Sequence, residues 1–399
     1  MRATHTAALA VMVASCNHCE PAEAPKDAAP SATVSAAPVE DAAPRARDAS
    51  VATPVDAGPI DAGSSACRLA YGPAEQTFRG PAALVVTTTE LRLVANDSGK
   101  PKIYSVPLGA QTPPKPTSFV GMRWPPCEVA GKWAYCPGPG GIVNRSTIEG
   151  EALAAVAKSR PGTRIAAGAV GPQHSVVAFL DSKRTSEGEL LQAFVVLDHG
   201  EVERLSEEGA GATTVQIVPR GDGALAAYLD TRTSMVPVHA RPIGANGDKL
   251  ALGADAVVFV GGAPDRGIDF TIAATKKDAF VLLPIAHESA DFGMAAIPLH
   301  DPPKTDVSAV WSMYPNGLDP APIAAAGSFV ARVRPREREP GSPRILELGR
   351  IDEAGAFTSF GAIADGRRIT DIAMATDKDG VWILYGDTGA TFLERRVCP

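Results

Sequence analysis

The sequence of 399 residues lacks the short motifs that mark common catalytic sites. It contains no Gly-x-Ser-x-Gly nucleophile elbow, no phosphate-binding P-loop and no His-Glu-x-x-His zinc motif. The glycine-rich segment 138–141 does not have dinucleotide-binding spacing, so we interpret it as a turn. The seven histidines are scattered, and no two of them stand at metal-ligand spacing. We therefore expect no cofactor and no bound metal, and a quinone- or metal-dependent dehydrogenase has no motif in its favour.

The chain also carries little net charge outside its N-terminal sixth. Residues 1–66 contain four of the 38 basic residues and eight of the 45 acidic ones. The remaining 34 basic and 37 acidic residues give residues 67–399 a net charge of −3, against −7 for the whole chain. Binding to a nucleic-acid backbone usually requires a clearly basic surface. We therefore expect no nucleic-acid partner.

The N-terminus has the features of an export signal. Arg2 supplies a positive charge, and the apolar run AALAVMVA at residues 7–14 is too short to span a bilayer, which takes about 20 residues. The run ends in VASC at residues 13–16, which resembles the lipobox of bacterial lipoproteins. The resemblance implies a signal peptide over residues 1–15 and a lipid on Cys16 that anchors the protein to the membrane. An ordinary signal peptide, with Cys16 incidental, is the alternative.

The same resemblance bears on where the protein is located. Asn17, rather than an aspartate, follows Cys16. Among better-known lipoproteins this favours the outer membrane or the periplasmic face of the cell envelope. Residues 17–66 are rich in Ala and Pro and contain no aromatic residue. Such a segment cannot bury enough apolar surface to offset its ordering entropy, so residues 16–66 are predicted to be a lipidated cysteine followed by a disordered linker.

Six cysteines fit an exported chain that forms disulfide bonds. If Gly131-Lys132 form the tip of a two-residue hairpin, residues whose numbers add to 263 face each other, and Cys127 and Cys136 are such a pair. Cys67 begins the predicted folded region and Cys398 is the penultimate residue, so a bond between them would join the two ends of the domain. A zinc site is the alternative for these four cysteines, but their spacing fits one poorly. Cys19 is left unassigned.

A motif of about 50 residues recurs seven times between residue 81 and the C-terminus, with copies that start at residues 81, 131, 174, 223, 278, 327 and 379. Each copy is a turn, an apolar run, a polar loop and a second apolar run. A fixed period of this size is typical of an array of one supersecondary unit. Helical periodicity is nearly absent, and 50 residues hold about four strands of 5–6 residues. The runs at 280–283 and 381–385 are apolar on both faces, as expected for a small sheet between two neighbours.

This organisation resembles that of β-propeller proteins over residues 67–399, although no signature of a particular propeller family is present. We predict an all-β fold of seven four-stranded blades, or six or eight if the weak copies at 81 and 131 are miscounted. The last copy shows three strands, 369–376, 381–386 and 391–397, so segment 67–71 is predicted to supply its outer strand and close the ring. The alternative, a stack of β-sandwiches, needs about 100 residues per domain, twice the observed period.

Charged residues follow the second strand run of four consecutive copies. In propellers these loops share a face with the inter-blade connections, and that face commonly holds the binding site. Arginine suits such a surface because its planar fork binds carboxylates bidentately. Ordinary solvated hairpin tips are the alternative interpretation. The candidate binding residues are Asp181, Lys183 and Arg184 in the third copy, Asp230 and Arg232 in the fourth, His287, Glu288 and Asp291 in the fifth, and Arg334, Arg336 and Arg338 in the sixth.

These observations combine into one functional hypothesis. The protein is predicted to be a non-enzymatic, envelope-anchored propeller that is monomeric, touches the membrane through lipidated Cys16, and binds a protein or glycan partner through the charged loops. The alternative is a propeller hydrolase or lyase acting on envelope or extracellular polysaccharide. That enzyme would use two carboxylates, drawn from residues such as Asp181, Asp230 and Glu288, as its acid and base.

Overall fold

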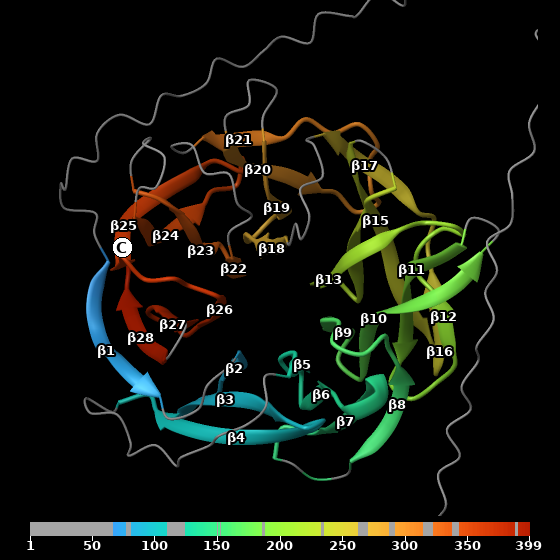
Figure 1. Ribbon diagram of the computed structural model, residues 1–399, viewed down its shortest axis with the longest axis horizontal. Coiled ribbons are helices and arrows are strands. Elements are labelled where there is room, and N and C mark those ends of the chain that lie inside the picture. Colours follow the sequence, from blue (N-terminus) through green and yellow to red (C-terminus); the bar gives the residue numbers. More distant parts are fainter. Residues whose placement is uncertain are drawn as a thin grey trace, which may run out of the picture. The chain divides into compact units, whose positions relative to one another are not determined.

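The computed structural model describes residues 67–76, 81–109, 124–149, 151, 153–185, 188–232, 235–261, 270–286, 292–313, 322–336, 343–387 and 390–399. Contacts divide the chain into Met1–Ala52 and Thr53–Pro399, and every described residue belongs to the second unit. The predicted signal peptide (1–15) and linker (16–66), with Cys16 and Cys19, lie outside the described residues. In the described part, seven antiparallel sheets surround a common centre, and the chain is a seven-bladed β-propeller (Figure 1).

The blades follow one another along the chain, and the first strand of each lies nearest the centre of the ring (Figure 1). Blade 1 contains β2 (Ala82–Val86), β3 (Glu90–Asp97) and β4 (Lys100–Pro107). Blade 2 contains β5 (Glu128–Ala130), β6 (Trp133–Pro137), β7 (Ile142–Thr147) and β8 (Ala154–Lys158). Blade 3 contains β9 (Ile165–Val170), β10 (His174–Thr185), β11 (Gly188–Leu197) and β12 (Val202–Arg204).

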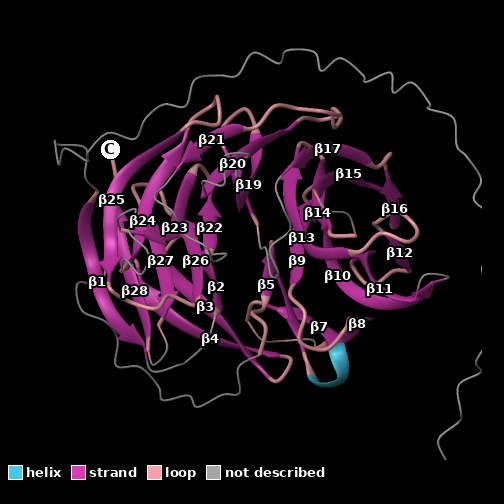
Figure 2. Ribbon diagram, turned by 45° about the horizontal axis from the view of Figure 1, so that its top comes forward, coloured by secondary structure: helices cyan, strands magenta, loops and turns pink. Residues whose placement is uncertain are grey.

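The remaining blades repeat the pattern. Blade 4 contains β13 (Ala212–Arg220), β14 (Gly223–Asp230), β15 (Val236–Asn246), β16 (Lys249–Leu252) and β17 (Ala256–Gly261). Blade 5 contains β18 (Thr271–Ala274), β19 (Ala279–Ala286), β20 (Phe292–Leu299) and β21 (Val310–Met313). Blade 6 contains β22 (Ile323–Ala326), β23 (Phe329–Pro335), β24 (Arg344–Ile351) and β25 (Phe357–Asp365). Blade 7 contains β26 (Asp371–Thr376), β27 (Val381–Gly386), β28 (Thr391–Val397) and β1 (Arg68–Gln76). Apart from a short 3-10 turn at Pro139–Gly141, the regular structure of the described residues is all strand (Figure 2).

The second strands are apolar on both faces because each blade packs between two others. In β19, Val281 and Leu283 belong to a buried cluster shared with blade 4, whereas Phe280 and Leu282 belong to one shared with blade 6. Successive residues of a strand point to opposite faces, so one uninterrupted apolar run supplies two separate cores. The interpretation of these runs as sandwiched strands is confirmed, and the β-sandwich alternative is wrong.

The phase of the first predicted copy is corrected, and blades 1 and 4 depart from four strands among the described residues. The copy that starts at residue 81 introduces the first strand of its blade, β2, whereas the other copies introduce second strands, so the first copy is one strand out of phase. Blade 1 shows three strands among the described residues rather than four. In blade 4 the outer position is divided, because β16 and β17 both pair with the same edge of β15. Segment 253–255 lies in the interruption between them.

The ring closes as predicted. Strand β1 pairs antiparallel with β28, so the N-terminal strand of the folded region is the outer strand of the last blade (Figure 1). The Cys67–Cys398 disulfide joins the start of β1 to the end of β28 across a sequence separation of 331 residues. Strand pairing and a covalent bond therefore close the ring at the same place.

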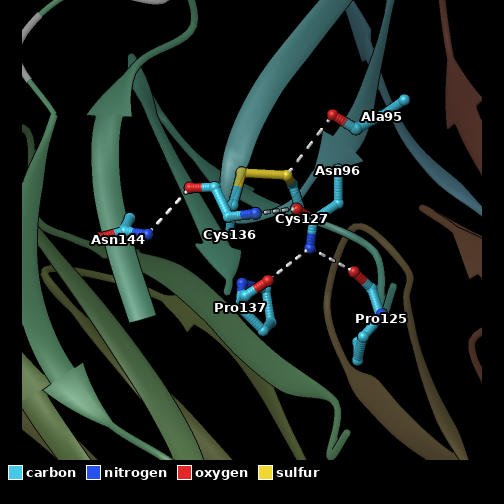
Figure 3. Close-up of a disulfide and its surroundings, with 8 residues drawn as sticks. Ala95, Asn96, Pro125, Cys127, Cys136, Pro137 and Asn144 are labelled. Carbon is cyan, nitrogen blue, oxygen red and sulfur yellow. Dashed lines mark hydrogen bonds between the residues drawn. A yellow bond between two sulfur atoms is a disulfide. The ribbon is translucent and has the colours of Figure 1, made fainter. Parts of the chain in front are cut away.

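The second predicted disulfide, Cys127–Cys136, is also present (Figure 3). Glu128 faces Tyr135 and Ala130 faces Trp133, which is the predicted hairpin register. Beside this bond, the 6 % exposed Asn96 of blade 1 donates from Nδ2 to the carbonyl oxygens of Pro125 and Pro137 at 2.7 and 2.8 Å. Because Pro137 ends β6, a buried side-chain amide fastens blade 1 to blade 2 next to the disulfide.

Candidate binding site

The charged loops of blades 3, 4 and 6 connect the second to the third strand of each blade, and most of their candidate residues lie at the ends of the second strands themselves. Their described residues are Asp181, Lys183, Arg184, Asp230, Arg232, Arg334 and Arg336. The other four candidates, His287, Glu288, Asp291 and Arg338, lie outside the described residues.

In blade 3 the predicted loop is a continuation of the strands. Strand β9 pairs with β10 only as far as Phe179, whereas β10 and β11 stay paired to their tip at Thr185 and Gly188. The two strands therefore extend as a β-ribbon arm (Figure 1). Lys183 and Arg184 are exposed on it, and Lys183 Nζ lies 3.6 Å from Asp181 Oδ2.

In blade 4, Asp230 is a buried anchor of its hairpin rather than an exposed loop residue. It is 3 % exposed, and its carboxylate accepts hydrogen bonds from Arg232 Nη2 at 2.6 Å and from the backbone N–H of Gly211 at 3.0 Å. Burial raises the pKa of Asp230, but these hydrogen bonds outweigh that effect and the pKa is lowered. An ionised carboxylate held in this way is the opposite of a general acid, which needs a raised pKa.

In blade 6 the two described arginines are also paired with acids. Arg334 is 6 % exposed, and its Nη2 donates to Glu347 Oε1 at 3.0 Å. Arg336 is exposed, and its Nη2 lies 2.8 Å from Asp365 Oδ2. In the described part of this face, Lys183, Arg232 and the two blade 6 arginines thus each contact a carboxylate of their own blade.

A cavity of about 440 Å³ lies between blades 2 and 3. It is lined by the β5–β6 turn, with Lys132 and Trp133, and by the β9–β10 turn, with Gln173 and His174. Turns between first and second strands lie on the opposite face of the ring from turns between second and third strands. This cleft is therefore on the face away from the charged loops, and its volume is in the range of small-molecule sites.

Asp198 orients the histidine of the cleft. Its Oδ2 accepts a hydrogen bond from His174 Nδ1 at 2.8 Å, and its Oδ1 accepts from the backbone N–H of Ser175 at 3.2 Å and from Ser175 Oγ at 3.1 Å. Burial raises the pKa of Asp198, but the hydrogen bonds from His174 and Ser175 outweigh it and the pKa is lowered. With Nδ1 donating to the carboxylate, Nε2 of a neutral His174 is left as a hydrogen-bond acceptor.

Arg145 fixes the aromatic ring of the cleft. Its guanidinium lies 3.7 Å from the centre of the Trp133 ring, and its Nη2 lies 3.4 Å from Asp198 Oδ1. A second bond across the blades joins Tyr135 Oη to Ser175 Oγ at 2.6 Å. A cation stacked on an indole holds the ring by about 0.5–2 kcal/mol. Trp133 and His174 are thus positioned by one continuous network from blades 2 and 3.

The composition of this network resembles a Ser-His-Asp triad, but its connectivity does not. In a triad the serine hydroxyl bonds to the histidine, which takes its proton. Here Ser175 Oγ bonds to Asp198 and Tyr135 instead, and Ser175 is 2 % exposed. The arrangement therefore offers an aromatic ring and oriented polar groups to a ligand, and no activated nucleophile.

None of the described residues among the sequence-predicted candidates lines this cleft. A signal for it was nevertheless present in the sequence. Thr185 faces Gly188, so residues of β10 and β11 whose numbers add to 373 face each other, which places Ser175 opposite Asp198. The same arithmetic located the Cys127–Cys136 disulfide.

Two searches of the described residues bear on other kinds of site. Among the residues that the structure describes, no three His, Cys, Asp or Glu side chains are grouped so that they could hold a metal ion. No helix in this part of the chain is long and apolar enough to cross a membrane.

The known proteins that resemble this chain are solved structures. No protein-family model and no curated protein matches the chain. It is similar to the WD40 repeats of RRP9, with 13 % identity, a TM-score of 0.48, and 84 % of this chain and 98 % of the other covered. It is also similar to the Cps50 (Swd1) β-propeller domain of Myceliophteria thermophila, with 11 % identity, a TM-score of 0.49 and coverage of 84 % and 100 %. YCF48 from Cyanidioschyzon merolae matches with 13 % identity, a TM-score of 0.42 and coverage of 82 % and 98 %.

Proposed function

We propose that this chain is an exported, lipid-anchored propeller without enzymatic activity, and that it binds a glycan in the cleft between blades 2 and 3. The lipobox-like segment 13–16 and the Ala/Pro-rich segment 17–66 support export and a tether to the cell envelope. The observation that carries the binding function is the pairing of a fixed Trp133 ring with an oriented His174 in one cavity.

The chemistry of the cleft favours a glycan. A sugar ring presents C–H groups on its face and hydroxyls at its edge, so it is recognised by an aromatic ring together with a few polar side chains. The cleft offers the Trp133 ring, the His174 imidazole, and the side chains of Lys132 and Gln173 at its rim. Arg145 and Asp198 fix two of these groups before the ligand arrives, which reduces the entropic cost of binding.

Replacing Trp133 by alanine tests the glycan site. The full chain would first be screened against an array of envelope and extracellular polysaccharide fragments, and the best fragment would then be titrated. We expect the Trp133→Ala variant to bind it about 2- to 12-fold more weakly, because an aromatic contact contributes about 0.5–1.5 kcal/mol. The double variant Lys183→Ala, Arg184→Ala, altered on the opposite face, is the control and should bind like wild type.

Three outcomes would count against parts of this proposal. Wild type that binds no fragment would exclude the glycan site, and cross-linked co-purification with the same double variant would then test a protein partner at the β10–β11 arm. Equal titration curves for wild type and Trp133→Ala would place binding elsewhere. Release of new reducing ends from the bound fragment would establish the hydrolase or lyase instead.

Replacing Cys16 by serine tests the anchor. Serine cannot form the thioether that carries the diacylglycerol, so we expect the variant to move from the membrane pellet to the soluble fraction after cell lysis. Multiple acyl chains hold a protein through about 0.8 kcal/mol per buried methylene, so the shift should be nearly complete. A Cys19→Ser variant is the control and should remain in the pellet. Unchanged fractionation of Cys16→Ser would contradict lipidation at this residue.

A further inference from the structure

A second cavity, of about 570 Å³, lies between blades 3 and 4. Its lining comes from the end of β12, from the segment that follows it, from β15, and from the interruption between β16 and β17 that the divided outer strand of blade 4 leaves open. The residues concerned are Arg204, Ser206, Glu207, Glu208, Arg241 and Asp255. None of them lines the proposed glycan cleft.

Two side chains of blade 4 hold Asp255 in place. Its side chain is 9 % exposed, and its Oδ2 accepts hydrogen bonds from the Tyr228 hydroxyl at 2.7 Å and from His239 Nδ1 at 2.8 Å. The Tyr228 and His239 rings are stacked, with centroids 4.6 Å apart. Burial and the hydrogen bond to Asp255 both raise the pKa of Tyr228, so its hydroxyl remains a donor. The Oδ2 atom is therefore fully used by the fold.

The other carboxylate oxygen of Asp255 is not used. Within the described residues, Oδ1 is buried and has no hydrogen-bond partner. A buried acceptor left without a donor has lost its hydrogen bonds to water without replacement, which destabilises the fold, most of all when the group is charged. Native proteins rarely tolerate this unless another molecule supplies the donor. Because Asp255 lines the cavity, the cavity is the place from which such a donor can come.

The charges around the cavity indicate which donor fits. Arg204 Nη2 lies 3.4 Å from Glu208 Oε2. Arg241 donates from Nε to Gly253 O at 2.8 Å and from Nη1 to Leu205 O at 2.8 Å, so its guanidinium is committed to backbone carbonyls. Glu207 is another carboxylate of the lining, and its backbone N–H donates to the Tyr228 hydroxyl at 3.4 Å. The lining contains three carboxylates and two guanidinium groups, a net charge of −1, which favours a cation.

We propose that this cavity binds an alkylammonium group, with Asp255 Oδ1 as its principal acceptor and Glu207 as a second negative charge. An ammonium group carries three donors and one positive charge, so it supplies a donor to Asp255 Oδ1 and offsets the net charge of −1 in the lining. The group can belong to a free diamine or to a lysine side chain of a protein, since both present the same chemistry.

Calorimetric titration of the full chain tests this site with two probes, 1,5-diaminopentane and Nα-acetyl-lysine methylamide. We expect the Asp255→Asn variant to bind either probe at least about tenfold more weakly, because the amide places a donor or a neutral oxygen where Oδ1 stood. Asparagine can still accept the bonds from Tyr228 and His239, so the near-UV circular dichroism should stay as in wild type. Asp278→Asn, which removes one acid from another blade, is the control for net charge and should bind normally.

The outcomes separate cleanly. Tighter binding of the lysine derivative points to a protein side chain, and tighter binding of the diamine points to a free amine, and both support the site. Three results would overturn the proposal. They are equal affinity of wild type and Asp255→Asn for the probes, no binding of either probe to wild type, and equally tight binding of the neutral compound 1,5-pentanediol.

Discussion

Replacing both Cys67 and Cys398 by serine is expected to lower the free energy of unfolding by about 5 kcal/mol. A disulfide restricts the unfolded chain in proportion to the logarithm of the loop that it closes, and this one closes a loop across 331 residues. The measurement is the midpoint and slope of urea unfolding, followed by tryptophan fluorescence in the absence of reductant.

The second disulfide provides the matched control for this result. Cys127 and Cys136 are only nine residues apart in sequence. Replacing both by serine should therefore lower the free energy of unfolding by about 2–3 kcal/mol, which is less than the loss expected at Cys67 and Cys398. Equal losses from the two variants would mean that loop length does not govern the effect. A negligible loss at Cys67 and Cys398 would show that pairing of β1 with β28 is sufficient to close the ring.

The substitution Glu347→Gln is expected to lower the free energy of unfolding by about 3–5 kcal/mol. Glu347 is 2 % exposed and lies between two arginines, with Arg332 Nε 2.8 Å from Oε2 and Arg334 Nη2 3.0 Å from Oε1. Both arginine side chains are only 8 % exposed, so removal of the carboxylate charge leaves two buried cations without their counter-ion. Asp365→Asn is the control, because it breaks the exposed Arg336–Asp365 pair and should cost less than about 1 kcal/mol.

The pH dependence of the same variant provides a second test. Burial raises the pKa of Glu347, but the charges of Arg332 and Arg334 and the hydrogen bonds from Arg334 and Ser359 outweigh it and lower the pKa to about 2. A carboxyl with a lowered pKa stabilises the fold above its unfolded pKa of about 4.3 and loses that contribution as the pH falls toward 2. The stability gap between wild type and Glu347→Gln should therefore be constant near neutral pH and narrow between about pH 4.5 and 2. A gap that does not change over this interval would contradict the assignment.

The propeller architecture could be predicted from the sequence, because the features that determine it are either local in the chain or covalent bonds. The 50-residue period, the doubly apolar second strands and the opposed cysteines each depend on spacing along the chain, and together they predicted the blades, the closing strand and both disulfides. The error in phase at residue 81 has the same origin. In that copy the first strand, 82–86, is as apolar as a typical second strand, and the spacing of the copies alone does not distinguish the two.

The candidate sites could not be predicted in the same way, because they depend on side-chain contacts that the spacing of strands does not determine. The charged residues were placed on the right hairpins, but Glu347, which buries Arg334, lies on the next strand, and Asp230 is enclosed by its own hairpin. The cleft joins Trp133 of one blade to His174 and Asp198 of the next. The contact of Trp133 and Arg145 with blade 3 depends on packing between blades, which no pattern within a single repeat encodes.

The position of the Cys67–Cys398 bond also determines how the domain carries mechanical load. A pull on the segment that precedes residue 67 reaches β1 at its first residue, Arg68, which pairs with Val397. In an antiparallel pair pulled from that end, the hydrogen bonds would break one after another, as in the opening of a zipper. The disulfide lies ahead of the first of these bonds and passes the force directly to the end of β28. Tension applied from the N-terminal side is therefore borne by the disulfide before it reaches the hydrogen bonds between β1 and β28.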